Sequence, residues 1–285
     1  MQHVIGIGEL LWDVLPDGKK LGGAPCNFVY HAQKQGANGL VLSAVGDDKN
    51  GKEILEVLKS KNISNLLIQV NDKPTSTVDV MLHKDGIPEY IIHNNVAWDF
   101  IRFDELLVKK IAKADILCFG TLAQRNAVTR VTIEQLLKLS KPDALIVFDI
   151  NLRQNFYNKK IIERSLGMCN VLKLNEDELP IVCNFLKVES TNEEEQILSL
   201  IKTYNLKLVA FTKGGEDSLL MTPTDRSYLK TPKVEVKDTV GAGDSFTAAM
   251  MVGFLNQNPL KEIHQKAVEI SAFVCTQDGA MPEYN

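Results

Sequence analysis

The stretch over residues 238–246, which reads DTVGAGDSF, carries the side chains best suited to chemistry. An apolar run over residues 246–255 follows it and is long enough for a helix of about three turns. Gly241, Ala242 and Gly243 are therefore predicted to form the first turn of that helix. Small residues let an anion approach the backbone, and the first N–H groups of a helix have no internal acceptor. The stretch predicts a site for an anion such as phosphate.

Asp244 lies in the positive end of this predicted helix, so its carboxylate is expected to be ionised at pH 7. Beside an anion site, such a carboxylate can take the proton from a hydroxyl group that attacks a phosphoryl group. The plain alternative is an ordinary helix start, because Asp is common in first turns. The P-loop pattern, GxxxxGK followed by Ser or Thr, does not occur in the chain.

A buried first strand is predicted over residues 4–11, with the acids Glu9 and Asp13 at its carboxyl end. In an open α/β sheet that end faces the usual ligand crevice, although Asp13 also suits a turn. The next polar stretch, Gly22 to Asn27, has a Gly-Gly pair ahead of a predicted helix. Bare backbone at the two glycines lets a ligand lie close, and a loop that leads into a helix is the alternative.

Polar residues also follow two later strands. Asp149, Asn151 and Arg153 alternate at the end of one strand, which places them on one side of an extended chain. Residues 175–178, which read NEDE, follow the next strand at a helix start, where acids are ordinary partners of the helix dipole. A turn over residues 213–215 is predicted either to lie near phosphates or to be a turn and nothing more.

The rest of the chain alternates strands and helices. Strands are predicted over 41–46, 116–119, 144–150, 171–174, 208–212, 219–221 and 227–229, and helices over 28–35, 51–60, 128–140, 246–255 and 260–276. Two half-exposed strands, 77–82 and 90–93, flank Asp85-Gly86 and predict a hairpin that covers a site. The alternation predicts a mostly parallel sheet with helices on both faces.

Composition limits the class of protein. A chain of 285 residues allows one large domain or two small ones, and 45% hydrophobic with 24% charged residues is ordinary for a soluble protein. A net charge of −4 provides no general basic field for nucleic acid. Five cysteines without a CxxC pair favour reduced thiols. Since no signal peptide or apolar run of about 18 residues is found, we expect a cytoplasmic protein without a membrane contact.

Two signatures carry a family resemblance. Residues 238–251 resemble the C-terminal signature of the ribokinase-like (PfkB-type) carbohydrate kinases, and residues 22–27, GGAPCN, with Gly36 and Gly46 downstream, resemble the N-terminal one. One position departs, because Val29 stands where a smaller residue is usual, and this bears on how the helix packs there. The signatures occur in the right order and the resemblance runs over residues 6–280, so the chain is identified as a member of this family.

The resemblance implies a fold and an activity. The fold is a three-layer α/β domain over residues 1–285, with a mostly parallel central sheet and a small β lid formed by about 12–21 and 75–98. The activity is transfer of the γ-phosphoryl group of ATP, with Mg²⁺, to a hydroxyl group of a sugar or a related small molecule. Many members also hold a monovalent cation such as K⁺, and lids in this family pair into homodimers.

The resemblance also assigns roles, residue by residue. Asp244 matches the catalytic base, and Gly241, Ala242 and Gly243 match the anion hole. The implied sugar contacts are Asp13, Gly22, Gly23 and Asn27, to which Trp12, Asn151 and Arg153 are added. The implied nucleotide contacts are Lys173, Asn175, Thr212, Gly214, Gly215 and Gly243. Asn175 and Glu178 match an element linked to Mg²⁺, through water. The candidates for a monovalent cation are Asp238, Val240, Cys275 and Gly279.

The substrate is less closely specified. Residues 9–18, 21–25 and 95–99 resemble bacterial fructokinases, which implies D-fructose as acceptor and fructose 6-phosphate as product. Residues 149–153 also resemble 2-keto-3-deoxygluconate kinases, where Arg153 would pair with a carboxylate, and other sugar or nucleoside kinases of the family remain open. Outside the kinases, an inactive nucleotide- or sugar-binding regulator is the alternative. A dinucleotide oxidoreductase is disfavoured, because no GxGxxG follows a strand.

Overall fold

The computed structural model describes residues 2–15, 18–82 and 88–284. The predicted hairpin tip at Asp85-Gly86 lies outside these ranges. Within them, no helix combines the length and the apolar character needed to cross a membrane.

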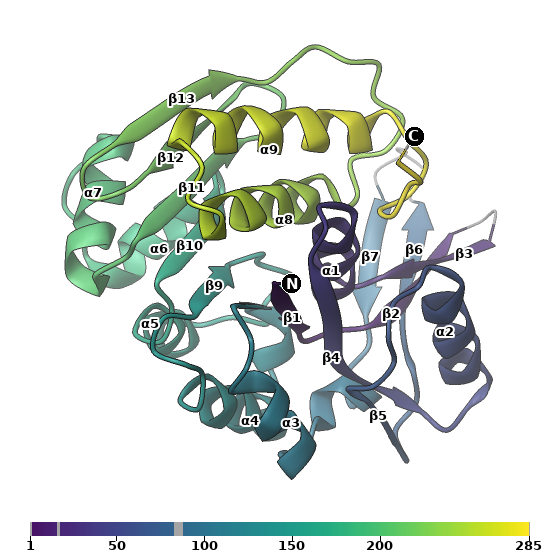
Figure 1. Cartoon of the computed structure of the whole chain (residues 1–285). Helices are drawn as coiled ribbons and strands as arrows, with labels where there is room; N and C mark the ends of the chain where they lie inside the picture. Colours follow the sequence, from purple (N-terminus) through teal and green to yellow (C-terminus); the bar gives the residue numbers. More distant parts are fainter. Residues whose placement is uncertain (1, 16–17, 83–87, 285) are drawn as a thin grey trace.

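A large sheet runs through the centre of the molecule (Figure 1). In the described ranges its strand order is β13-β12-β11-β10-β9-β8-β1-β4-β5. The strands are β1 (His3–Ile7), β4 (Asn38–Gly46), β5 (Ile68–Asn71), β8 (Ile116–Gly120), β9 (Leu145–Asp149), β10 (Val171–Asn175), β11 (Leu208–Lys213), β12 (Asp217–Met221) and β13 (Arg226–Lys230). The β11–β12 and β12–β13 pairs are antiparallel, and the other neighbours are parallel. The mostly parallel sheet expected from the sequence is confirmed.

Helices cover both faces of this sheet (Figure 1). One face carries α1 (Ala24–Lys34), α2 (Lys49–Ser60), α8 (Ala242–Leu255) and α9 (Leu260–Cys275). The other carries α3 (Glu105–Ile111), α4 (Ala127–Leu137), α5 (Lys159–Leu166), α6 (Glu178–Leu186) and α7 (Glu193–Tyr204). Two 3₁₀ turns, η1 (Ala97–Phe100) and η2 (Leu122–Gln124), complete the second layer.

Alternation along the strands builds one core on each face. On β1, Val4 packs into the core under α1 and α8, whereas Ile5 packs into the core under α3 to α7. On β9, Val147 and Phe148 divide in the same way. Because the central strands are covered on both sides, they are mostly apolar, and most polar groups appear where the strands end. Lys173 in the middle of β10 is an exception.

A second, smaller sheet in the order β3-β2-β6-β7 lies beside the main one (Figure 1). Its strands are β2 (Leu11–Leu15), β3 (Gly18–Gly22), β6 (Ser76–Leu82) and β7 (Pro88–Ile92). The single first strand expected over residues 4–11 is wrong, because the chain leaves the main sheet after Ile7. Gly8 has φ 147°, a conformation that glycine adopts readily, and β2 then starts the second sheet.

Val29, the residue that departs from the family signature, lies fully buried on α1. Its methyl groups fill the space where Gly6 of β1 and Gly39 of β4 lack a side chain, because a Cβ at either glycine would meet them at 3.0 and 2.7 Å. Two glycines on neighbouring strands therefore accommodate the larger residue, and α1 lies close against the sheet.

Candidate active site

The start of α8 is a glycine turn, as the sequence predicts. Gly241 is the N-cap of the helix and has φ 81°, in the left-handed region. A Cβ on Gly241 would lie 2.8 Å from the Cα, Cβ and O atoms of Ala280, so both its conformation and its surroundings require glycine. Among the hydrogen bonds of the described residues, none uses the N–H groups of Gly241 or Gly243. These N–H groups are therefore free to bind an anion at the helix end.

Asp244 lies in the first turn of α8 and is partly buried. Its Oδ2 accepts a hydrogen bond of 2.8 Å from the side-chain amide of Asn27 on α1. Burial, with a smaller contribution from the charge of Asp149, raises the pKa of Asp244 to about 7, against the opposing effects of Asn27, Lys173 and Arg153. The expectation that Asp244 is fully ionised at pH 7 is therefore wrong, because loss of water outweighs the donors around the helix end.

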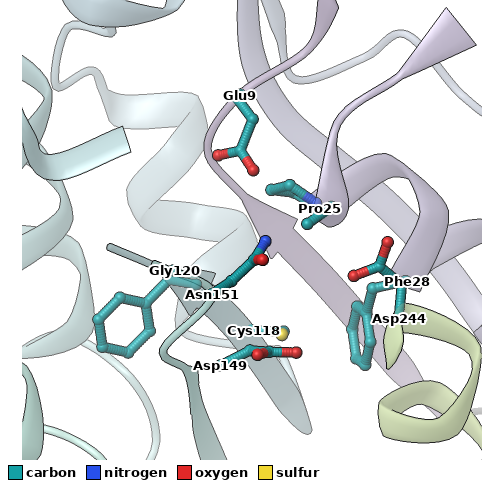
Figure 2. Close-up of a pocket in the computed structure, with 10 residues that line it drawn as sticks. Glu9, Pro25, Phe28, Cys118, Gly120, Asp149, Asn151 and Asp244 are labelled. Carbon is teal, nitrogen blue, oxygen red and sulfur yellow. The ribbon is translucent and has the colours of Figure 1, made fainter. Parts of the chain in front are cut away.

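Asp244 lines a narrow pocket of about 20 Å³ at the carboxyl ends of the central strands (Figure 2). In parallel α/β sheets this edge is the usual position of a ligand crevice. Strands β8 and β9, the segments that follow β1 and β9, and the N-terminal parts of α1 and α8 supply the walls. The lining residues are Glu9, Ala24, Pro25, Phe28, Cys118, Phe119, Gly120, Asp149, Asn151 and Asp244.

Glu9 is a pocket residue to which the sequence analysis assigns no role. It is 4% exposed, and its Oε2 has no hydrogen-bond partner among the described residues. Burial raises its pKa, whereas N–H groups of the backbone and the charge of Arg153 oppose the shift. In Figure 2 its carboxyl group points toward the amide of Asn151. The available sequence signal was its position directly after β1, at the end of a central strand.

Lys173 on β10 places a buried positive charge beside the glycine turn. Its Nζ lies 3.2 Å from Oδ1 of Asp149 and 3.3 Å from the position of a Cβ on Gly243. Burial lowers the pKa of Lys173, but the charges of Asp149, Glu178 and Asp244 more than offset that effect, so the pKa is raised. Lys173 is therefore charged and lies where a phosphate at the turn would meet it.

Asn175 and Glu178 accept hydrogen bonds from backbone groups that follow β9 and end β10. Oδ1 of Asn175 accepts from the N–H groups of Asp177 and Glu178. The Glu178 carboxylate accepts from the N–H groups of Leu152 and Asn175, at 2.9 Å each. Glu178 is 4% exposed, and burial raises its pKa against the opposing charge of Lys173. The structure thus brings this pair beside Lys173 and Asp149 and ties it to backbone groups.

The donor set is suitable for a metal ion that arrives with phosphate. Within the described residues, no three His, Cys, Asp or Glu side chains are arranged to hold a metal ion by themselves. The buried carboxylates of Asp149, Glu178 and Asp244 nevertheless surround one cation, Lys173. Carboxylate oxygens with room for water and phosphate are the surroundings that Mg²⁺ prefers, so the residues fit such an ion.

Asp13 does not end the first strand of the main sheet, as expected, but lies within β2 of the smaller sheet. There it faces Gly22, where a Cβ would collide with its carboxylate. Burial raises the pKa of Asp13 to about 6; Arg153 opposes the shift and Asp238 adds to it. The strand thus carries Asp13 over the edge of the main sheet, toward the exposed side chain of Arg153.

Trp12, an implied sugar contact, packs against protein in this structure. It is 4% exposed, and its Nε1 donates to the carbonyl of Asn50 on α2 at 3.1 Å. Lys19 lies over its ring, 4.7 Å from the centroid. Because neighbouring residues of a strand face opposite sides, Trp12 packs toward α2 while Asp13 faces the other way.

The remaining sugar candidates lie near the pocket. Gly23 is the N-cap of α1 with φ 117°, and a Cβ there would collide with the carbonyl of Glu9. Asn27 is 3% exposed, and its Oδ1 has no partner among the described residues. Asn151 lines the pocket with φ 43°. Arg153 is exposed and donates to the carbonyl of its neighbour Leu152.

The nucleotide candidates beyond Lys173 form an open turn at the end of β11. Thr212 pairs with Ser218 across the β11–β12 ladder. Gly214 has φ 47°, and no atom lies within 4 Å of a Cβ placed on Gly215. This turn does not line the pocket around Asp244.

The four cation candidates meet just before the glycine turn. The Asp238 carboxylate accepts from the N–H groups of Val240 and Gly279, at 3.0 and 3.1 Å. The N–H group of Asp238 donates to the carbonyl of Cys275 at 3.3 Å. The side chain of Val240 is apolar, so only the backbone oxygen of that residue suits a cation.

Comparison with known proteins connects this site to an enzyme family. Residues 15–284 match the family described as "pfkB family carbohydrate kinase". The Arabidopsis thaliana protein named "Probable fructokinase-5" is 27% identical over 307 residues, which cover 98% of this chain and 93% of that protein.

Solved structures agree. A sugar kinase of Pyrococcus horikoshii in complex with ATP is 27% identical, covers 98% of this chain and 94% of its own, and gives a TM-score of 0.82. A double mutant of fructokinase from Vibrio cholerae, bound to fructose, ADP and potassium ion, is 23% identical, with coverages of 99% and 94% and a TM-score of 0.81. These likenesses confirm the three-layer α/β fold.

Proposed function

The chain belongs to the pfkB family of carbohydrate kinases, and from this premise we propose that it transfers the γ-phosphoryl group of ATP to the primary O6 hydroxyl group of D-fructose. The observation that carries the proposal is the position of Asp244. This carboxylate shares the first turn of α8 with the glycines and lines the pocket at the strand ends. A hydroxyl group in that pocket and a phosphate at the turn would meet beside it.

In the proposed reaction Asp244 accepts the proton of the sugar hydroxyl group. The hydroxyl oxygen forms a bond to the γ-phosphorus, the bond from that phosphorus to the β–γ bridging oxygen breaks, and ADP leaves. The N–H groups of Gly241 and Gly243 stabilise charge on the transferring group, whereas the N–H group of Ala242 donates to the carbonyl of Thr239. Lys173 adds a fixed positive charge. Because the transition state of phosphoryl transfer is loose, positioning by these groups carries much of the rate.

The pocket favours a neutral sugar over an acidic one. Of the described residues that line it, Glu9, Asp149 and Asp244 are acidic and none is Lys or Arg. The carboxylate of 2-keto-3-deoxygluconate would meet oxygen acceptors there and no lining cation, so it would lose water without gaining a charged partner. Arg153, its expected partner, is exposed and bonded to the carbonyl of Leu152. Asp13, Gly23, Asn27 and Glu9 instead provide acceptors and close backbone for sugar hydroxyl groups.

The comparisons support the same substrate class. Relatives named fructokinase match 98% of this chain, and the Vibrio cholerae structure contains fructose, ADP and potassium ion. In the proposal Thr212, Gly214, Gly215 and Asn175 contact the nucleotide, and Asp238, Val240, Cys275 and Gly279 surround a monovalent cation. Mg²⁺, held through water near Glu178 and Asp149, would supply charge neutralisation on the phosphates.

The smaller sheet is the proposed lid. The chain enters this sheet from β1 through residues 8–10 and leaves it for α1 through Gly23, and Asp13 lies on β2. Closure over a bound sugar would place Asp13 and Gly23 against it. Through this sheet two copies of the chain would pair into a homodimer. The whole chain would act as one domain in the cytoplasm, without nucleic-acid or membrane partners.

A coupled assay for ADP formation tests the proposal. The panel contains fructose, ribose, adenosine, 2-keto-3-deoxygluconate and fructose 6-phosphate. We expect fructose to give the highest kcat/KM. At least tenfold better use of another acceptor would overturn the choice of fructose. If no acceptor of the panel led to ADP formation, the inactive binding regulator would be favoured.

A further inference from the structure

The C-terminal segment Gly279–Tyr284, here called the C-terminal strap, crosses α1 outside any helix or strand (the yellow tail in Figure 1). Three successive carbonyl groups of the strap accept hydrogen bonds from side chains. The bonds run from Nε2 of His31 to the carbonyl of Ala280 at 2.8 Å, from Nζ of Lys61 to that of Met281 at 3.0 Å and from the hydroxyl group of Tyr30 to that of Pro282 at 2.6 Å. The strap is therefore fixed by side chains of α1 and of the end of α2.

His31 is the innermost of these anchors. It is fully buried, and burial lowers its pKa to about 4, so the ring is neutral at pH 7. A carbonyl oxygen can only accept, so Nε2 carries the proton and donates to Ala280. The other nitrogen, Nδ1, must then accept, and the hydroxyl group of Tyr284 donates to it at 2.7 Å. Both ring nitrogens thus bind the strap.

The residue that His31 holds is the one that packs against the anion-binding turn. Ala280 is 6% exposed, and its Cα, Cβ and O atoms lie 2.8 Å from the position of a Cβ on Gly241. The residue before it, Gly279, donates to Asp238, which also binds the N–H of Val240. The strap therefore packs behind the turn at Gly241, whose N–H groups would face a bound phosphate.

The same helix also holds the proposed base. Asn27 and His31 are one helical turn apart on α1, so they lie on one face. Asn27 donates to the Asp244 carboxylate, and His31 donates to the wall behind Gly241. One face of α1 thus binds the start of α8 at two points, the carboxylate and the glycine turn.

We infer that His31 is a positioning residue for phosphoryl transfer, which acts by clamping Ala280 of the C-terminal strap against Gly241. This inference rests on the proposed function and names a residue that touches neither substrate. Without the clamp, the turn can shift relative to the phosphate while the fold and the sugar pocket stay intact. The effect belongs to the transition state, where charge on the transferring group meets the N–H groups, so it changes kcat and leaves KM.

Two substitutions of His31 separate the clamp from general packing. The amide nitrogen of His31→Gln reaches the position of Nε2 and keeps a donor for Ala280. The side chain of His31→Asn is one bond shorter, ends near Nδ1 and leaves the Ala280 carbonyl without a donor. We expect His31→Asn to lower kcat about 10- to 100-fold, below the ~10²–10³ for loss of a whole oxyanion donor, with both KM values changed by less than about threefold. His31→Gln should restore kcat to within about threefold of wild type.

His264 provides the matched control. It is also fully buried with a pKa of about 4, between Ser218 and Ser227, at 2.8 and 2.9 Å. His264→Asn should lower the melting temperature but leave kcat within about twofold of wild type, because its partners lie outside the glycine turn. An equal loss of kcat in His264→Asn and His31→Asn, or no rescue by His31→Gln, would overturn the inference.

Hydrogen exchange provides a readout that does not depend on turnover. The backbone N–H groups of Ala242 and Ser245, which donate to the carbonyls of Thr239 and Gly241, should exchange faster in His31→Asn than in wild type or His31→Gln. If the wild-type chain phosphorylates no sugar, the proposed function fails, whereas this measurement still tests the clamp. Unchanged exchange would overturn it. Should His31→Asn not fold, His31→Phe keeps a buried ring but removes the donor to the Ala280 carbonyl, and unchanged exchange and kcat there would equally count against the clamp.

Discussion

The side-chain amide of Asn27 donates a hydrogen bond of 2.8 Å to Oδ2 of Asp244, although the residues are 217 positions apart in the chain. The bond joins the N-terminal signature to the C-terminal one and favours the ionised carboxylate against burial, which raises its pKa to about 7. The C-terminal signature thus supplies the proposed base, and the N-terminal signature supplies the side chain that donates a hydrogen bond to it.

The first prediction is a pH profile. A base must be deprotonated, so kcat/KM for fructose should rise with pH through an apparent pKa of about 7 and then level off. Initial rates from pH 5 to pH 9 measure it, with the coupling enzymes in excess at each pH. A profile already flat above pH 5 would mean that Asp244 has an ordinary carboxyl pKa or is not the base.

Asn27→Ala should move that profile. Loss of a donor to the charged form raises the pKa of Asp244, and a hydrogen bond to a charged group is worth about 1.5–3 kcal/mol. The acid limb should therefore shift upward by about one to two units at ~1.36 kcal/mol per unit, so the loss of activity is larger at pH 6.5 than at pH 9. An equal loss at both values would restrict Asn27 to sugar binding or packing.

Gly241→Ala should lower kcat strongly. The added Cβ meets Ala280 at 2.8 Å in a left-handed conformation, which shifts the turn, and a misplacement of about 1 Å can cost ~10²-fold. The control is Gly36→Ala, since Gly36 has φ 89° but no atom within 4 Å of its Cβ position. Gly36→Ala measures only the cost of placing alanine in a left-handed conformation, about 1 kcal/mol. Similar kcat values in the two variants would contradict the role of the turn.

Asp13→Ala should weaken use of the sugar and leave ATP binding in place. Hydrogen bonds from sugar hydroxyl groups to a carboxylate are worth about 1.5–3 kcal/mol, which corresponds to about 10- to 150-fold in kcat/KM for fructose. Trp12→Phe, on the other face of the same strand, should affect melting temperature rather than kcat/KM. Unchanged fructose kinetics in Asp13→Ala would remove this residue from the site.

Local sequence was enough to predict the glycine turn at the start of α8. Gly241 to Gly243 stand directly before an apolar helix, and the glycine-specific geometry at Gly241 follows from a pattern within a few residues. The positions of Asp13 and Trp12 were harder to predict, because an apolar run over residues 4–11 gives no sign that the chain changes sheets at Gly8. Short helices such as α3 and α5 were missed, since 7 and 8 residues give too few turns for an apolar pattern to be distinguished from a loop.

The electrostatics and the long-range contacts could not be predicted. The raised pKa of Asp244 depends on how deeply it is buried beside Asp149, which no local pattern contains. The bond from His31 to Ala280 joins residues 249 positions apart. Glu9 was visible at a strand end, but only the packed pocket shows that one of its oxygens lacks a partner.

The central claim is that Asp244 is the base of a sugar kinase, and steady-state kinetics of Asp244→Asn test it most directly. Asn keeps the volume but cannot accept the proton, so kcat should fall at least about a hundredfold, the lower end of the ~10²–10⁴ for a positioned base, while both KM values change little.

Melting curves control for folding. Because the pKa of Asp244 is raised above its unfolded value, its ionisation destabilises the folded state as pH rises from about 4 to about 7. Asp244→Asn should therefore be at least as stable as wild type at pH 8, with the gain disappearing toward pH 4. A folded Asp244→Asn variant that keeps more than about a tenth of wild-type kcat, well above the range for a lost base, would contradict the account.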